Sequence, residues 1–294
     1  MKICNIALIG RPNTGKSTLL NNIIGYDLSI ITNTPQTTRD QIRGIYTDDE
    51  YQLIFIDTPG IHKANHLLNE KLNKSSYDSL EEADLILFLQ PINEEIGRGD
   101  KFIIEKLKDF DNKIAVITKM DLGEIEAANQ KASELKNLGF NTVVGVGLTL
   151  NQTYEDLISI IKHEYADKLE ENEEPFYDPE LITDVSMRFI AKETIRETAI
   201  NYLKEELPHS IAVVVDDFEE NEDAPYVIRA TIFVKRESQK GIVVGKGGSM
   251  IKKISMNSRH KIANQFQHPI VLELRVKVNQ DWVDDEKQIK KMGY

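Results

Sequence analysis

The chain has 294 residues, of which 40% are hydrophobic, and its formal net charge is −12. This length suits two domains with substantial cores, and so negative a charge excludes a nucleic-acid-binding surface spread over the whole protein. Cys4 is the single cysteine and no apolar run approaches 18 residues, which excludes an internal disulfide, predicts no membrane-spanning helix and fits the reduced cytoplasm.

The first motif is GRPNTGKS at residues 10–17, which has the phosphate-binding pattern G-x-x-x-x-G-K-[ST]. The apolar run 3–9 before it predicts a strand, and LLNNIIGYD after it predicts a helix that begins near Lys16. Backbone N–H groups of the loop would face phosphate oxygens, with Lys16 at the β- and γ-phosphates and Ser17 on Mg²⁺. A glycine-rich turn without a ligand is the alternative, so the neighbouring motifs decide. The predicted nucleotide-binding residues here are Gly10, Asn13, Thr14, Gly15, Lys16, Ser17 and Thr18.

The next two stretches predict a Mg²⁺ site and a contact with the γ-phosphate. Residues 29–42 are polar and aperiodic, which predicts a loop, and Thr38 within it offers a second hydroxyl to the metal. In DTPG at 57–60, Asp57 can hold the water shell of Mg²⁺ and Gly60 can offer its backbone N–H to the γ-phosphate. Taken alone, Thr38 is an ordinary loop threonine and DTPG is a strand followed by a turn. The predicted metal-binding set is Ser17, Thr38 and Asp57, and the predicted catalytic set is Lys16, Thr38 and Gly60.

Alternating strands and helices predict a doubly wound, mostly parallel α/β sheet with its sites at the carboxyl ends of the strands. Further strands are predicted at 43–47, 51–56, 84–89, 113–118 and 142–146, and helices at 101–110 and 154–168.

TKMD at 118–121 ends one of these strands and predicts a guanine site. Asp121 can accept two hydrogen bonds, from the N1–H and the exocyclic amine of guanine, whereas adenine has the opposite polarity at N1 and lacks that amine. Lys119 can lay its stem along the base. A Thr-Lys-x-Asp string is common by itself, but its place at a strand end, about a hundred residues after the P-loop, favours this interpretation.

In this order the P-loop, TTR, DTPG and TKMD resemble the G1–G4 motifs of GTPases of the translation-factor class. Two positions depart from the pattern, since Thr118 stands where the fourth motif usually begins with Asn, and Gly147 and Leu148 stand where the fifth is usually Ser-Ala. The backbone of that fifth motif touches the guanine oxygen. Guanine selectivity is therefore expected to rest on Asp121, with reduced nucleotide affinity.

A further departure concerns the residue after the third motif. Ras-like switches place a Gln there to orient water, but this chain has Ile61, followed by His62, which we expect to be solvated. The chain here resembles GTPases with a hydrophobic residue at that position. This resemblance implies that Asn13 helps hold K⁺ beside the phosphates, where the cation supplies the charge of an arginine finger. We expect slow intrinsic hydrolysis of GTP to GDP and phosphate.

The C-terminal part has a different charge balance. Residues 225–294 contain 14 Lys or Arg and 6 Asp or Glu, a net of +8, which leaves −20 for the remainder of the −12 chain. This asymmetry suggests that the C-terminal part meets an anion. The acidic, aperiodic stretch 164–184 predicts a linker. A helix is predicted at 182–207, stopped by Pro208, followed by strands at 211–218 and 226–234.

GKGG at 245–248 is a G-x-x-G loop between two helical segments, which in a KH domain brings the backbone close to a nucleic-acid strand. A glycine-rich helix–helix turn is the alternative, but this loop is basic and lies within the positive segment. A helix at 249–266 and a strand at 270–278 complete an α-β-β-α-α-β order that matches the prokaryotic-type KH fold. The predicted RNA-binding residues are Gly245, Lys246, Gly247, Gly248, Lys252 and Lys253.

The pairing of these two halves, with KRESQKGIVVGKGG and KVNQDW, resembles the Era family of GTPases over nearly the whole chain. The resemblance implies a bacterial, cytoplasmic, monomeric GTPase that assists maturation of the small ribosomal subunit. Its KH domain would bind the single-stranded 3′ end of small-subunit ribosomal RNA, and peripheral contact with the inner membrane is also implied. We expect a GTPase domain at 1–170, an acidic linker at 171–181 and a KH domain at 182–294.

Two other functions stay open from the sequence. One is a metabolic P-loop enzyme, such as a nucleotide kinase with an accessory domain, against which DTPG and TKMD argue. The other is a KH-type RNA-binding regulator with a weak or degenerate nucleotide site, which Thr118 and Gly147 keep open. Measurement of GTP turnover separates this last function from a GTPase.

Overall fold

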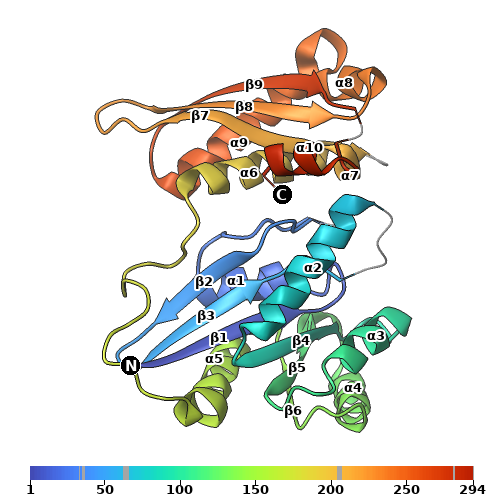
Figure 1. Cartoon of the computed structure of the whole chain (residues 1–294), viewed down its shortest axis with the longest axis vertical. Coiled ribbons are helices and arrows are strands. Elements are labelled where there is room, and N and C mark those ends of the chain that lie inside the picture. The colour runs from blue at the N-terminus through green and yellow to red at the C-terminus, as the bar shows by residue number, and fades with distance from the viewer. Residues whose placement is uncertain (33, 35–36, 62–65, 204–206, 281, 294) are drawn as a thin grey trace. The chain divides into compact units, whose positions relative to one another are not determined.

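The computed structural model describes residues 1–32, 34, 37–61, 66–203, 207–280 and 282–293, which form two compact units (Figure 1). The first unit contains Met1–Ser29, Thr38–Lys63 and Lys71–Asp184, and the second contains Ile30–Thr37, Ala64–Glu70 and Val185–Tyr294. Each unit has a sheet and a cluster of buried apolar residues of its own.

The first unit is built on a six-stranded sheet of order β2-β3-β1-β4-β5-β6. Only β2 and β3 are antiparallel, and the other neighbouring strands are parallel. β3 and β4 are buried along their whole length, as expected for strands covered on both faces. The six predicted strands are confirmed, with limits that move by at most two residues. The strands are β1 (Lys2–Ile9), β2 (Ile42–Thr47), β3 (Tyr51–Asp57), β4 (Leu85–Pro91), β5 (Lys113–Thr118) and β6 (Thr142–Gly145).

Helices cover this sheet, and three of them share one apolar cluster with it. Leu80, Ile104 and Leu135, from successive helices, pack in the same cluster as Phe88 of β4. The predicted helix 154–168 begins earlier, at Asn151, and continues through a π-helical turn and a 3₁₀ turn to Lys168. The helices are α1 (Lys16–Ile24), α2 (Leu67–Glu81), α3 (Arg98–Lys106), α4 (Ile125–Asn137) and α5 (Asn151–Ile160).

The sheet topology explains why distant motifs meet. Because β1, β3, β4 and β5 are parallel, their carboxyl ends lie along one edge of the sheet. The P-loop follows β1, Asp57 ends β3 and Thr118 ends β5. Leu8 pairs directly with Asp57 in the β1–β3 register, so the P-loop and DTPG start side by side.

The segment predicted to be a linker, 171–181, falls within the first unit. Tyr177 and Gln52 of β3 exchange two hydrogen bonds, from the backbone N–H of Tyr177 to Oε1 and from Nε2 to the Tyr177 carbonyl, each 2.9 Å. Ile45 of β2 donates its N–H to the Ile182 carbonyl at 2.8 Å. These hydrogen bonds attach the acidic segment to β2 and β3. The limits of the GTPase domain, the linker and the KH domain expected from the sequence remain a prediction.

The second unit has a three-stranded sheet of order β7-β8-β9, in which β8 is antiparallel to β7 and parallel to β9. Apart from the short helices α7 after α6 and α10 after β9, the order α6-β7-β8-α8-α9-β9 agrees with the α-β-β-α-α-β order expected from the sequence. The elements are α6 (Met187–Tyr202), α7 (Leu207–Ser210), β7 (Ala212–Glu219), β8 (Tyr226–Val234), α8 (Glu237–Val244), α9 (Ser249–Phe266), β9 (Ile270–Val278) and α10 (Glu286–Lys291).

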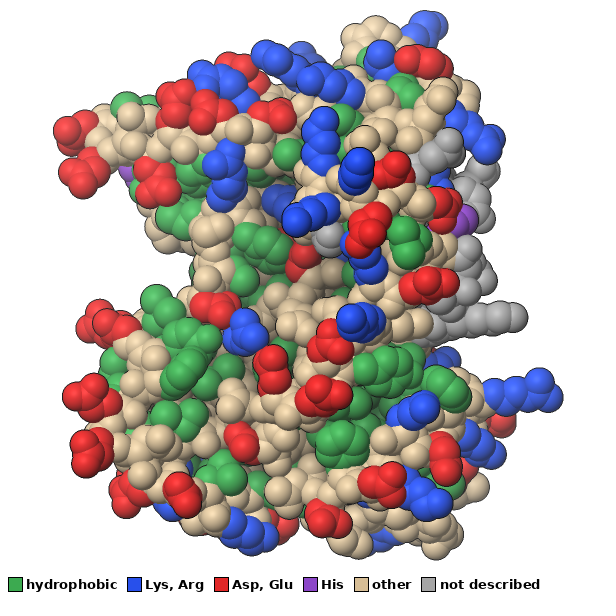
Figure 2. Space-filling model, viewed as in Figure 1, with side chains coloured by type: hydrophobic (Ala, Val, Ile, Leu, Met, Phe, Trp, Pro, Cys, Tyr) green, Lys and Arg blue, Asp and Glu red, His purple; other side chains and the backbone are tan. Residues whose placement is uncertain are grey.

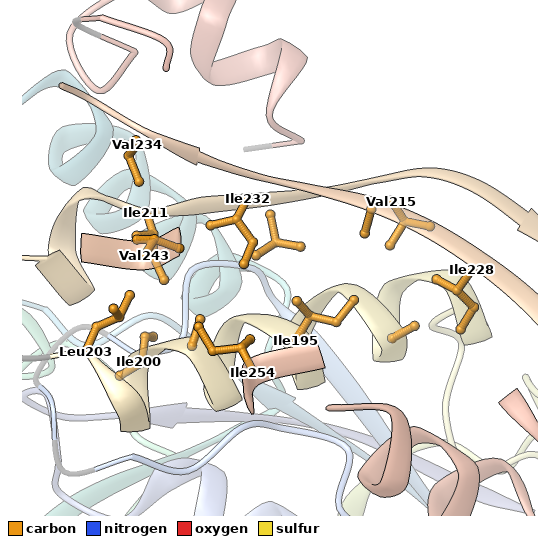
Figure 3. Packing of buried hydrophobic residues seen from close by; sticks show 14 of the residues in the cluster. Ile195, Ile200, Leu203, Ile211, Val215, Ile228, Ile232, Val234, Val243 and Ile254 are labelled. Atoms are coloured by element: carbon orange, nitrogen blue, oxygen red, sulfur yellow. The ribbon is translucent and has the colours of Figure 1, made fainter. Parts of the chain in front are cut away.

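The core of the second unit lies between its sheet and its helices (Figure 3). Ile195 and Ile200 of α6, Val243 of α8 and Ile254 of α9 lie in one buried cluster with Ile232 of β8. Burial alternates along β9, which is typical of a strand with one face on the core and one face in solvent. The sheet and the three helices therefore form two layers that pack on each other. This packing supports the loop that connects α8 to α9.

The predicted limits of the first helix of this unit are wrong. Helix α6 begins at Met187, because the hydroxyl of Ser186 accepts a hydrogen bond from the Phe189 N–H and caps the helix. It ends at Tyr202, since Leu203 adopts an extended backbone with ψ 150°. Pro208 does not end α6 but lies in the first turn of α7. Proline is tolerated there because the backbone N–H groups of a first turn have no partner within the helix.

Candidate nucleotide site and RNA-binding loop

The P-loop connects β1 to α1 and encloses the ammonium group of Lys16. Gly15 has φ 100° and Asn13 has φ 63°, so the chain turns through left-handed conformations before α1 begins. The Nζ atom of Lys16 donates to the carbonyls of Gly10 at 3.3 Å and Arg11 at 3.0 Å. Burial lowers the pKa of Lys16 to about 8, against the opposing effect of Asp57. A buried cation that faces the loop suits a phosphate ligand.

Thr14 and Thr18, the other predicted P-loop residues, lie on either side of Lys16. The side chain of Thr14 is fully buried and donates from Oγ1 to the Arg11 carbonyl at 3.0 Å, which holds the loop closed on itself. Thr18 lies in the first turn of α1, where its carbonyl accepts from Asn22.

The three residues predicted to bind Mg²⁺ come together. The hydroxyl of Ser17 donates to Oδ2 of Asp57 at 2.7 Å and lies 3.0 Å from the hydroxyl of Thr38. Burial raises the pKa of Asp57, while Lys16 and the hydroxyls oppose this change. Oδ1 of Asp57 is buried and has no hydrogen-bond partner among the described residues. Two hydroxyls and a carboxylate with an unused oxygen are the hard oxygen donors that suit Mg²⁺.

The DTPG loop packs directly on the P-loop. A Cβ at Gly60 would lie 2.6 Å from the backbone nitrogen of Pro12 and 2.7 Å from its Cα, so no side chain fits there. Thr58 anchors the loop by donating from its hydroxyl to the Leu8 carbonyl at 2.7 Å. Ile61 is buried in the cluster under α2 and α3, so its side chain belongs to the core. The prediction for His62 lies outside the described residues.

Thr118 and Asp121 link the base-recognition motif to the two loops beside it. Thr118 donates from its hydroxyl to the Thr14 carbonyl at 2.6 Å, which ties TKMD to the P-loop despite the absence of Asn. Asp121 is exposed, and its Oδ1 accepts the N–H of Leu148 at 3.0 Å. A Cβ at Gly147 would lie 3.0 Å from both the N and Oδ1 of Asp121. The structure thus places Gly147 and Leu148 at the predicted base site.

A charged network that the sequence analysis missed joins the same loops. Arg11 of the P-loop donates to Asp100 at 2.7 Å and to Glu94 at 2.9 Å, and Asp100 is fully buried. Glu94 also lies 3.7 Å from the ammonium of Lys119. The guanidinium of Arg11 is therefore held on the side of the base motif. The partners lie more than 80 residues from Arg11 in sequence, and no local pattern signals the pairing.

The GKGG segment forms an open turn between α8 and α9. Gly245, Gly247 and Gly248 have φ of 74°, 60° and 79°, and α9 begins directly after them. A Cβ at Gly247 or Gly248 would meet nothing within 4 Å, whereas one at Gly245 would lie 2.8 Å from the backbone of Met250. The last two glycines therefore leave their outer side clear for a ligand backbone.

The basic residues of this loop have different surroundings. Lys246 and Lys252 are exposed, and Lys253 lies with its Nζ 4.4 Å from the ring centroid of Tyr202. Figure 2 shows that Lys and Arg gather toward the α8 end of the second unit, while Asp and Glu gather around the turn between β7 and β8. Such a division gives this unit a cationic end beside its glycine loop.

Helix length and polarity decide whether a helical segment can cross a membrane. Within the described ranges, every helix is too short or too polar to cross a bilayer.

Both halves of the chain match known protein families. Residues 5–120 match the family described as 50S ribosome-binding GTPase, and residues 206–283 match the KH domain. The GTPase Era of Mycoplasmopsis agalactiae is 53% identical over the whole of both chains. The GTPase Era of Clostridium botulinum strain Alaska E43 is 40% identical over 98% of this chain and 97% of the relative.

Two solved structures resemble the whole fold. A variant of Aquifex aeolicus Era bound to GDP.AlF4⁻ is 32% identical with a TM-score of 0.91, and it covers 100% of this chain and 99% of its own. Era in complex with MgGDPNP and nucleotides 1506–1542 of 16S ribosomal RNA is 33% identical, with the same TM-score and coverage. Full-length likeness in sequence and fold, at identities up to 53%, shows that the chain belongs to the Era family of GTPases.

Proposed function

We propose that this protein is a GTPase switch that hydrolyses GTP to GDP and phosphate and binds the 3′ end of small-subunit ribosomal RNA through its KH domain. The observation that carries the GTPase part is the convergence of Ser17, Thr38 and Asp57 beside the buried ammonium of Lys16. We assign the GTPase domain to residues 1–170, the acidic linker to 171–181 and the KH domain to 182–294.

In this proposal the P-loop residues hold the phosphates. Backbone N–H groups of residues 13–18 would face the anion at the start of α1, where the helix dipole also favours negative charge. Lys16 leaves its carbonyl partners for the β- and γ-phosphates. Gly60 offers its N–H to the γ-phosphate, and the contact with Pro12 explains why only glycine fits.

Ser17 and Thr38 would hold Mg²⁺ through their hydroxyls, and Asp57 would act through a water of its shell. The ion, when bound, neutralises charge that develops on the phosphates during hydrolysis. Burial of Lys16 and Asp57 strengthens these contacts, because charges interact more strongly away from water.

Guanine recognition is assigned to Asp121, with the stem of Lys119 along the base and the backbone of Gly147 and Leu148 at its oxygen. The hydrogen bond from Leu148 to Asp121 fixes the carboxylate for this contact. Thr118 supports the motif through its hydrogen bond to Thr14, so that the phosphate and base sites keep their spacing.

We also propose that Asn13 helps hold K⁺ beside the phosphates. Ile61 is apolar and buried in the core, so it offers no polar group to orient a water molecule. The guanidinium of Arg11 is bound by Asp100 and Glu94, so we assign the positive charge at the γ-phosphate to K⁺. Replacing potassium by sodium at equal ionic strength should slow GTP hydrolysis severalfold. Identical rates in the two salts would remove the cation from the mechanism.

The RNA part rests on the open GKGG turn, the exposed lysines and the family. The RNA would come from the small ribosomal subunit during its assembly, in the cytoplasm, with the protein acting as a monomer. Peripheral contact with the inner membrane is a further expectation from the family resemblance.

One experiment tests the function in the cell. Crosslinking the protein in growing cells and sequencing the attached RNA should recover the 3′ end of small-subunit ribosomal RNA above all other RNA. The Gly247→Asp variant, expressed at the same level, is the control. If the recovered RNA is unrelated to the ribosome, or is the same for the variant, the RNA assignment fails.

A further inference from the structure

Asp57 receives a second hydroxyl that the nucleotide-site motifs do not include. Oγ of Ser29 donates to Oδ2 of Asp57 at 2.7 Å, the same distance and the same oxygen as the hydrogen bond from Ser17. Oδ1 has no hydrogen-bond partner among the described residues. Two hydroxyl donors on one oxygen fix the rotation of the carboxylate and direct the other oxygen away from them.

Ser29 is itself held in place by α1. Oδ1 of Asn21 accepts the N–H groups of Leu28 at 3.1 Å and Ser29 at 2.9 Å, and its Nδ2 donates to the Ser29 carbonyl at 2.7 Å. Asn21 follows Ser17 by four residues, so both side chains project from the same face of α1. Both Ser29 and Asn21 are buried. One helix therefore orients Asp57 twice, directly through Ser17 and indirectly through Ser29.

We propose that Ser29 is a positioning residue that directs Asp57 toward the Mg²⁺ of the bound nucleotide. The inference rests on the proposed GTPase function. Ser29 acts through Asp57 and not on the metal itself. Without its hydroxyl, the carboxylate keeps Ser17 as its single hydroxyl donor and can rotate, which misplaces Oδ1. Partners that orient a metal-site ligand typically contribute about 10- to 100-fold to metal affinity.

A purely structural role for Ser29 predicts something different. In that case its hydroxyl only satisfies a buried carboxylate, and its loss would lower the stability of the protein with and without metal alike. The two roles separate when nucleotide release is measured both with Mg²⁺ and with the metal removed.

The test compares Ser29→Ala, Ser29→Thr and the control Ser79→Ala by release of a fluorescent GDP analogue. Ser79 is also buried in the first unit, where its hydroxyl donates to the Ser75 carbonyl at 3.1 Å and accepts a hydrogen bond from Nε2 of Gln41 at 2.6 Å. We expect Ser29→Ala to raise the half-saturating Mg²⁺ concentration about tenfold and to accelerate release in Mg²⁺, with unchanged release in EDTA. Ser29→Thr keeps the hydroxyl and should resemble wild type, as should Ser79→Ala.

Melting of the nucleotide-free proteins reports folding. If Ser29→Ala does not fold, Ser29→Cys keeps the volume with only a weak S–H donor and should show a smaller shift in the same direction. A half-saturating Mg²⁺ concentration within twofold of wild type overturns the proposal, and so does equal acceleration in EDTA. If wild-type release itself does not depend on Mg²⁺, the proposed GTPase site fails instead.

Discussion

Single residues in the nucleotide site have few alternatives to the contacts they make. Lys16 and Asp57 are both buried, so each depends on the few polar groups within reach, and Gly60 has no space for a Cβ. Asp121 differs from them because it is exposed and accepts a hydrogen bond from the N–H of Leu148. Substitutions of Lys16, Asp57 or Gly60 should therefore disturb the packing around the site as well as nucleotide binding, whereas substitution of the exposed Asp121 should change nucleotide binding more than folding.

Asp121→Asn should weaken GTP binding and favour xanthosine triphosphate, whose base offers an acceptor at the edge that guanine uses as a donor. A bidentate charge-assisted pair contributes about 2–4 kcal/mol, or roughly 30- to 1,000-fold in affinity. Titration calorimetry with both nucleotides measures the exchange of preference. Equal GTP affinity in wild type and variant would remove Asp121 from guanine recognition.

Lys16→Ala and Ser17→Ala should nearly abolish GTP turnover, because they remove the phosphate and Mg²⁺ contacts. Ile61→Val should leave turnover close to wild type and reduce stability by about 0.5–1.5 kcal/mol, since Ile61 packs in the core. Phosphate release and urea unfolding measure the two effects. If Ile61→Val loses turnover while it keeps its fold, Ile61 takes part in the reaction and the core assignment is incomplete.

At the level of elements, the first unit is held together by contacts between segments that are distant in sequence. The turn between β2 and β3 is held to the π-helical turn after α5, where Lys162 donates to Asp48 and its ammonium lies 4.8 Å from the ring centroid of Tyr46. Asp48 also accepts two N–H groups of its own turn, from Glu50 at 3.0 Å and Tyr51 at 2.8 Å. This one carboxylate therefore connects the antiparallel edge of the sheet to its last helix.

Asp48→Asn should lower the free energy of unfolding at pH 7 by about 1.5–3 kcal/mol. Although burial acts to raise it, the hydrogen bonds from Lys162, Glu50 and Tyr51 lower the pKa of Asp48 below its ordinary 3.8. A lowered carboxyl pKa stabilises the fold above pH 3.8, and this stabilisation is lost as the pH falls through the folded pKa.

Urea unfolding at several pH values tests this, with Asp49→Asn as the exposed neighbouring control. The difference between wild type and Asp48→Asn should shrink below pH 3.8, and Asp49→Asn should match wild type throughout. A constant difference at all pH values would show that the carboxylate charge is not the cause.

Strands and motifs could be predicted from the sequence because each leaves a local signal. Continuous apolar runs mark β1, β4 and β5, and their ends carry the motifs. Helix α2 was not predicted, since LLNEKLNKSSYDSLE is polar with a weak apolar stripe. The end of α6 at Tyr202 was also missed, because an extended Leu203 leaves no sequence mark. Ser29 and Arg11 could not be assigned, since their partners are separated from them by long stretches of chain.

For the whole molecule, charge divides the two activities between different parts of the chain. The GKGG turn lies within residues 225–294, whose net charge is +8, whereas the nucleotide-site residues lie in the part of the chain with excess negative charge. Variants of the KH loop should therefore change RNA binding and leave GTP hydrolysis without RNA unchanged.

Lys252→Ala should weaken RNA binding modestly and flatten its salt dependence. Removing one lysine–phosphate interaction with a single strand reduces the slope of log affinity against log salt by about 0.7. Lys252 is the cleaner choice because Lys253 also lies against the ring of Tyr202. Affinity measured at four salt concentrations gives the slope, and an unchanged slope would mean that Lys252 does not bind a phosphate.

In the proposed function, the GKGG turn of the KH domain binds the 3′ end of small-subunit ribosomal RNA. Fluorescence anisotropy with that single-stranded tail, a scrambled strand and a duplex of equal length measures this binding. Gly247→Asp places a carboxylate where a phosphate should pass. Gly247→Asn is the control for backbone strain, because Asn tolerates a φ of 60° as Asp does but carries no charge.

Wild type should prefer the tail over both competitors, and Gly247→Asp should lose at least about tenfold in affinity, or about 1.4 kcal/mol, with a smaller loss for Gly247→Asn. If wild type binds the three RNAs alike, or if Gly247→Asp binds the tail as well as wild type does, the GKGG turn does not recognise the ribosomal RNA tail even though the KH fold is present.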